Sequence, residues 1–117
     1  MIESKIEKLV VKLNNKTRQG LLPWEDAIEE GAYQAALSDF TVQISEEKRL
    51  NEDGDIRCIY LINIFNRLGK LVEEAYSFEV SQEMRETMTE LYKNARRSAT
   101  SAEKAIDTLM SELDDLR

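Results

Sequence analysis

Apolar residues recur every three or four positions over the first twenty residues, which is the spacing of one buried face of an α-helix. The apolar positions are Ile2, Ile6, Leu9, Val10 and Leu13. Gly20 stands where a helix C-terminal cap belongs, and Pro23, which cannot extend a helix smoothly, follows soon after. The pattern therefore predicts an N-terminal helix that ends near Gly20. Trp24 comes directly after this proline and is predicted to be a buried anchor between helix and sheet.

The period changes to two after Gly31, as it does in half-buried strands. Four segments alternate, or are rich in β-branched and aromatic residues: 33–37, 40–45, 56–66 and 70–78. A tight turn at Ser38-Asp39 separates the first two, and the polar segment 46–55 is interpreted as a hairpin loop. The acidic segment 25–31 has no period and is interpreted as a loop or a single helical turn.

The strand predicted over 56–66 is apolar on both faces. One face carries Ile56, Cys58, Tyr60, Ile62 and Ile64, and the other carries Ile59, Leu61 and Phe65. Such a strand is usually covered on both faces. Helices on both faces of the sheet would provide this cover within one chain, and a second chain at Ile59, Leu61 and Phe65 would provide it by self-association. Cys58 is expected to be buried and unreactive.

The chain from residue 82 onward has the composition and period of helix, with Ser81 as its N-cap. Residues 100–103 resemble a capping box, which predicts a break after Ala99. Because the apolar period runs through this break, one long helix is the alternative. Short loops make neighbouring strands antiparallel. We therefore expect a single α+β domain over residues 1–117: an N-terminal helix, a four-stranded antiparallel β-meander, and one long or two consecutive C-terminal helices, in the order α-β-β-β-β-α-α.

Composition and charge limit the classes of function that the chain can have. The chain has 117 residues, 16 basic and 23 acidic, with a net charge of −7, no histidine and one cysteine. Histidine-based triads, most zinc sites and an internal disulfide are excluded, so no catalytic residue, metal or cofactor is predicted. Nucleic acid is disfavoured by the acidic balance, although lysines 5, 8, 12 and 16 line the first helix. No apolar run approaches a membrane span, and a single thiol fits the reducing cytoplasm.

Arg96 and Arg97 are the most suggestive polar residues. They lie near a helix end, where the dipole favours cations, and a pair salt-bridged to acidic loops is the simpler interpretation. The alternative is an anion clamp in which Arg57 or Arg67 joins them from the sheet and Tyr92 stacks on a ring ligand.

Several short segments resemble a group of small bacterial proteins with no assigned activity. They are Trp24, Tyr33-Gln34-Ala35, 60–65, 69–74 and 91–99, the last ending in Ala-Arg-Arg-Ser-Ala. The resemblance implies a helix and a tryptophan leading into a β-meander and then a helix. It implies a bacterial or phage origin and transfers no functional residue.

The leading hypothesis is a non-catalytic interaction module that self-associates through its sheet or its helices, or binds another protein. The alternative is a protein that binds or sequesters a small anionic or nucleotide-like ligand.

Overall fold

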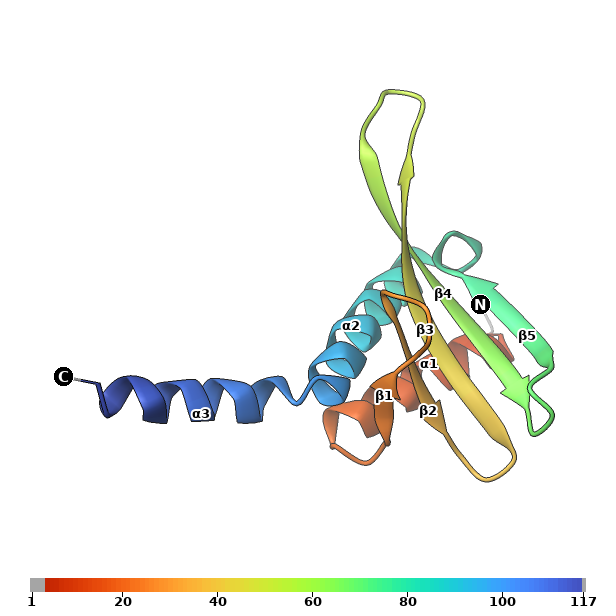
Figure 1. The fold of residues 1–117 in the computed structure, drawn as a ribbon. Helices are drawn as coiled ribbons and strands as arrows, with labels where there is room; N and C mark the ends of the chain where they lie inside the picture. Colours follow the sequence, from red (N-terminus) through yellow and green to blue (C-terminus); the bar gives the residue numbers. More distant parts are fainter. Residues whose placement is uncertain (1–3, 117) are drawn as a thin grey trace.

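A computed structural model describes residues 4–116, which form an antiparallel sheet with two α-helices packed against it and a third that extends away from it (Figure 1). Ile2 of the predicted helix lies outside these residues. The elements are α1 (Lys5–Arg18), β1 (Trp24–Asp26), β2 (Ala32–Ala36), β3 (Phe40–Leu50), β4 (Ile56–Asn66), β5 (Leu71–Tyr76), the 3₁₀-helix η1 (Ser77–Glu79), α2 (Gln82–Ala99) and α3 (Ala102–Asp114). The α+β class and the antiparallel meander are confirmed.

The sheet has five strands in the order β1-β2-β3-β4-β5, one more than predicted. The additional strand, β1, lies in the segment interpreted as a loop. Three residues are too few to show a period, and only the pairing of Trp24 with Ala35 and of Asp26 with Tyr33 identifies the strand. The predicted turn at Ser38-Asp39 is present, because the Leu37 amide donates to the Phe40 carbonyl at 2.8 Å.

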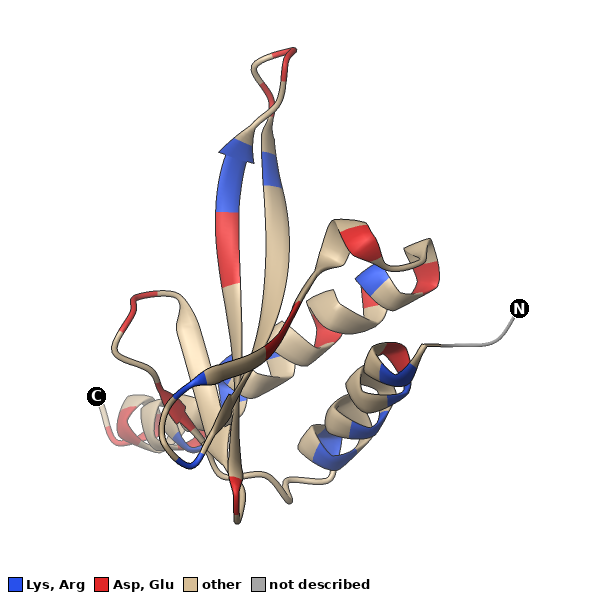
Figure 2. Ribbon diagram, turned by 90° about the vertical axis from the view of Figure 1, so that its right-hand side faces the viewer, with Lys and Arg blue, Asp and Glu red and all other residues tan. Residues whose placement is uncertain are grey.

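Both α1 and α2 lie on the same side of the sheet (Figures 1 and 2). The core forms where they meet it, and it consists of Val10, Leu13, Trp24, Ala35, Val42, Ile44, Tyr60, Ile62, Met88, Leu91, Tyr92 and Ala95. Within residues 4–116, α1 and α2 cover one face of the sheet, so the alternative in which helices cover both faces within one chain is not observed. Ile59, Leu61 and Phe65 lie on the face opposite these helices, since β-strand side chains alternate between faces.

The helices α1 and α2 run side by side in the same direction. The Glu7 carboxylate accepts hydrogen bonds from the amide and hydroxyl of Ser4 at 3.3 Å, and from the same groups of Ser81 at 3.4 and 3.3 Å. These serines are the N-caps of α1 and α2. The bond from the Ser4 backbone is the main reason that the pKa of Glu7 lies below its ordinary value. One carboxylate thus ties the two helix starts together.

Trp24 is the predicted anchor, and its burial is confirmed: its exposed fraction is 6%. Its indole Nε1 donates to Thr17 Oγ1 at 2.9 Å, and this hydroxyl donates to the Leu13 carbonyl at 2.7 Å. The end of α1 is fixed by Gly20, whose φ of 72° allows its amide to donate back to Thr17 and the next amide to donate to Lys16. This cap therefore directs the chain so that the Trp24 side chain contacts α1, the helix that precedes it.

The β3–β4 hairpin extends beyond the helices as an arm, formed by residues 48–58 (Figure 1). The predicted loop is shorter than expected, since β3 continues to Leu50 and only residues 51–55 turn. Leu50 and Ile56 are 73% and 67% exposed on this arm. Cys58 is also exposed, so the expectation that it is buried is wrong. Alternation placed Cys58 on the helix-covered face, but no pattern in the strand shows where the helices stop.

Candidate functional site

The last helix, α3, projects away from the folded body (Figure 1). None of its described residues is buried. Large apolar side chains nevertheless follow one face of it: Ile106, Leu109, Met110, Leu113 and Leu116, with exposed fractions of 45%, 56%, 59%, 64% and 71%. We call these five residues the α3 stripe. Together with Ala102, four of them are spaced by four, three, four and three residues, which is the repeat of a coiled-coil seam.

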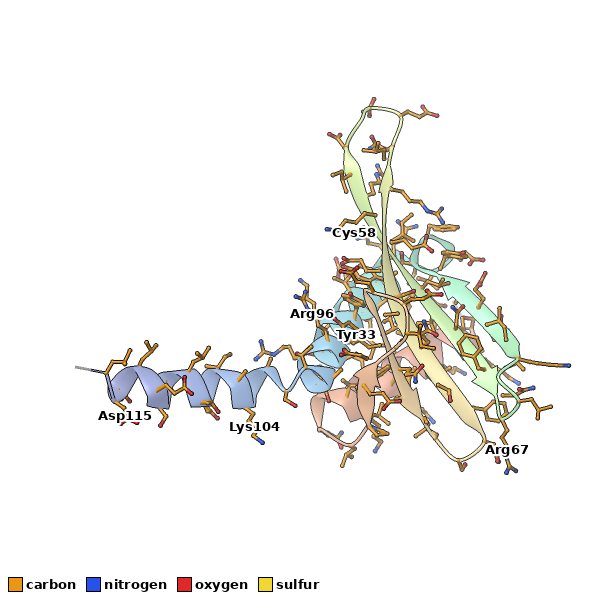
Figure 3. All side chains as sticks on the ribbon, in the orientation of Figure 1. Tyr33, Cys58, Arg67, Arg96, Lys104 and Asp115 are labelled. Carbon is orange, nitrogen blue, oxygen red and sulfur yellow. The ribbon has the colours of Figure 1, made fainter. Side chains whose placement is uncertain are left out.

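The α3 stripe faces the side on which the hairpin arm rises. Figure 3 shows Lys104 and Asp115 together on the far side of α3 from the arm. Successive helical residues turn by about 100°, so the residues of the stripe point away from Lys104 and Asp115. The arm and α3 therefore border a common open corner, and α3 presents its apolar face to it.

The elbow between α2 and α3 is made by Ser101, which has a φ of 54°. This left-handed conformation ends α2 as glycine does in many helix caps. The break after Ala99 is thus confirmed, but the capping box is not, because the N-cap of α3 is Ser101 in place of Thr100 and makes no side-chain cap bond. The Thr100 hydroxyl donates instead to the Arg96 carbonyl at 2.7 Å, and Glu103 pairs with Arg97.

Basic side chains gather around this elbow. One hollow of about 460 Å³ has Arg18, Arg97 and Lys104 in its wall, and a neighbouring one of about 450 Å³ has Lys93, Arg96 and Arg97. Arg18 also pairs with Glu90 at 3.4 Å. Lys93 and Arg96 are exposed and make no ion pair with any residue between 4 and 116. We call Arg18, Lys93, Arg96, Arg97 and Lys104 the basic elbow.

The structure does not bring the five residues of the predicted anion clamp together. Arg57 lies on the hairpin arm, and Arg67 lies in the β4–β5 turn, 3.7 Å from Asp39. Figure 3 shows Arg67 and Arg96 far apart on the molecule. Arg96 and Arg97 remain neighbours on α2, and Tyr92 lies one helical turn before Arg96. The prediction grouped Arg57 and Arg67 with the helix arginines by charge alone. Both lie toward the ends of β4, and these ends extend beyond the helices.

Tyr92 is part of the core, with an exposed fraction of 5%. Its hydroxyl donates to the Gly31 carbonyl at 3.0 Å, and its ring lies 5.6 Å from that of Tyr33 and 5.2 Å from that of Tyr60. Burial, with smaller contributions from Tyr33 and Glu46, raises the pKa of Tyr92 to about 12. The ring is thus packed against tyrosines and is not an open stacking surface for a ligand.

The predicted interface on the open face of the sheet is only partly apolar. Leu61 is 7% exposed, and Ile59 and Phe65 are half-buried. A polar row crosses this face from strand to strand, formed by Glu25, Gln34, Gln43, Asn63 and Glu74. Tyr76, the cross-strand neighbour of Leu61, stacks on Phe78 with ring centroids 4.9 Å apart. The Arg49 guanidinium lies 5.7 Å from the Tyr76 ring.

The sequence-based hypothesis named the helices as one of two surfaces for self-association, but it did not single out the α3 stripe. The apolar period of residues 102–116 was visible, and the residues named for the interface were those on the sheet. The one signal in the sequence is that the apolar period of the preceding helix continues past the predicted break after Ala99.

The residues that the structure describes contain neither a metal-site cluster nor a membrane-spanning helix. No three acidic or cysteine side chains among residues 4–116 gather as a metal site would require. No helix in that range is both long and apolar enough to cross a bilayer. Comparisons with protein-family models, curated proteins and solved structures found no match to this chain.

Proposed function

We propose that this chain is a non-catalytic interaction module that self-associates through α3. The observation that supports the proposal is the α3 stripe, a row of large apolar side chains on a helix without one buried residue among those described. An isolated helix of about 12–15 residues is marginal in water, and most helical stability in proteins comes from packing of an apolar face. A covered stripe explains why these residues stay apolar and helical.

A second copy is the occupant that the stripe fits. A seam of apolar residues at alternating spacings of three and four packs against another helix with the same spacing. The chain carries such a helix, so each copy supplies both halves of the contact. The open face of the sheet fits less well, because its polar row would be desolvated by a partner.

The non-catalytic assignment rests on the sequence, which has no histidine and no glycine-rich phosphate loop. The exposed thiol of Cys58 supports a reducing compartment, and we place the protein in the cytoplasm on that basis. The resemblance in the Ala-Arg-Arg-Ser-Ala segment and the preceding strands supports a bacterial or phage source.

Leu113→Ala tests the proposal in sedimentation equilibrium. Leu113 is 64% exposed in the single chain, so truncation removes about 1.5 kcal/mol of apolar burial per copy on association. Two copies lose about 3 kcal/mol, and the dimer is expected to weaken roughly 100-fold. Ser111→Ala, on the opposite face of α3, is the matched control and should leave the dimer unchanged. Equal dissociation constants for both variants would refute the role of the stripe.

A small anionic ligand is the second candidate, and the basic elbow supports it. The hollow that contains Arg18, Arg97 and Lys104 is large enough for part of a nucleotide. A thermal-shift screen with nucleotides and acidic metabolites tests it, since a ligand at 100 times its Kd adds about 2.7 kcal/mol of stability. A shift that Lys104→Ala and Arg97→Ala abolish supports the ligand. An unchanged Tm with every compound rejects it.

A further inference from the structure

Charge is distributed unevenly along α3. Its start adjoins the basic elbow, whereas Glu112, Asp114 and Asp115 lie at its end. Lys93 and Arg96 at the elbow have no acidic partner within the part of the chain that the structure describes. The first turn of α3 carries both Glu103 and Lys104, so the basic character at its start comes from the elbow residues of α1 and α2. The surroundings of α3 are therefore basic at its start, and the helix is acidic at its end. This polarity bears on how a second copy lies against it.

The polarity favours one of the two orientations of a helix pair. In a parallel pair, the two basic elbows meet and the two acidic ends meet, and both contacts are repulsive. In an antiparallel pair, the acidic end of each helix lies at the basic elbow of the other. The antiparallel pair also keeps the two folded bodies at opposite ends, because α3 projects from the body in one direction (Figure 1).

The spacing of the stripe defines a register for this antiparallel pair. With Ile106 opposite Leu109 of the second copy, Ala102 lies opposite Leu113, so every layer of the seam is apolar. The flanking positions then place Glu103 beside Met110 and Ala105 beside Glu112, and no like charges meet. This register brings Asp114 and Asp115 of the second copy level with residues 100–101. Because Asp115 lies on the side of its helix away from the seam, it points past α3 of the first copy, toward α2, whose Arg96 lies at the open corner in Figure 3.

We propose that α3 of a second copy packs antiparallel in this register, and that Lys93 and Arg96 on α2 receive its Asp114 and Asp115. The proposal rests on the proposed self-association through α3. It assigns the exposed cations of α2 a role in binding an acidic helix end, where the second candidate function would assign them to a small anion.

Cysteine cross-linking tests the orientation. In a Cys58→Ser background, Ala102→Cys and Leu113→Cys chains are oxidised separately and as a mixture. The antiparallel register predicts disulfide dimers in the mixture, which join one chain of each kind, and few in either sample alone. Self-linked Ala102→Cys would show a parallel pair and overturn the proposal.

Light scattering on Cys58→Ser without further changes distinguishes a failure of the antiparallel register from a failure of self-association. A dimer with no cross-link in any sample overturns the register and leaves self-association standing. A monomer at all concentrations overturns self-association itself.

Charge exchange tests the contact between the elbow and the helix end. Lys93→Glu/Arg96→Glu and Asp114→Lys/Asp115→Lys should each weaken the dimer by roughly tenfold, because each puts like charges together. Combining all four changes in one chain restores opposite charges and should restore the wild-type Kd. A parallel pair predicts no weakening by either double variant. Additive weakening in the combined variant would contradict the contact.

Discussion

Trp24→Ala measures how far one side chain holds α1 against the sheet. The ring is 6% exposed and lies in the core between Thr17 on α1 and Ala35 on β2, its cross-strand neighbour. Truncation of a buried aromatic residue costs about 3–5 kcal/mol, from lost transfer energy and from the cavity. This is a large share of the 5–15 kcal/mol that stabilises a typical domain, so we expect a strongly lowered urea midpoint.

The hydrogen bond from the indole separates burial from polar pairing. Thr17→Val keeps the shape of the side chain but leaves the buried indole Nε1 without its acceptor, which costs about 1–3 kcal/mol. Trp24→Phe removes the donor itself, and the Thr17 hydroxyl keeps its bond to the Leu13 carbonyl. The unfolding free energy lost in Thr17→Val is thus the cost of one unpaired buried donor. The loss in Trp24→Ala should be larger.

The assay must not depend on the residue under study. Trp24 is the single tryptophan, so unfolding of Trp24→Ala is followed by circular dichroism at 222 nm, and the wild type by both dichroism and fluorescence. Native wild-type emission should be blue-shifted and should move to the red cooperatively with urea. A loss below about 1.5 kcal/mol in Trp24→Ala, or a red native emission, would refute the anchor.

Three further outcomes follow from the titratable and exposed groups. The stability that Glu7 contributes is present above its unfolded pKa and is lost as the pH falls through its lowered folded pKa. The urea midpoints of Glu7→Gln and wild type should therefore converge in acid. A gap between the midpoints that stays constant with pH would contradict this. Burial raises the pKa of Tyr60 and Tyr92, the latter to about 12, so stability should fall as the pH rises from about 10, and Tyr92→Phe should flatten this loss in alkaline urea titrations. The thiol of Cys58 should react with Ellman's reagent in the native protein as fast as in urea, and a native rate many-fold slower would show a covered arm.

The sequence predicted the parts of the fold that depend on local patterns. Alternation in β4 assigned its two faces, and Ser81 as N-cap is confirmed by its bond from the Met84 amide at 3.2 Å. Repeating patterns of this kind are set by each segment alone. The strand β1 was missed because three residues show no pattern, and it exists through pairing with β2.

The candidate site was less predictable, because it depends on where elements end in space. Cys58 and Ile56 have the pattern of core residues, yet β4 passes beyond the helices and leaves them exposed. The α3 stripe likewise has the pattern of a core-facing helix, and only the left-handed backbone of Ser101 directs it away from the domain. A pattern shows which face of an element needs cover, but not what covers it.

The mass of the native protein as a function of concentration shows, without any substitution, whether the chain self-associates. One chain is 13.5 kDa. Light scattering over a series of micromolar concentrations should show the mean mass rising toward twice this value, and Leu113→Ala should move the rise to higher concentration. A mass that stays at one chain throughout the series would contradict self-association through α3.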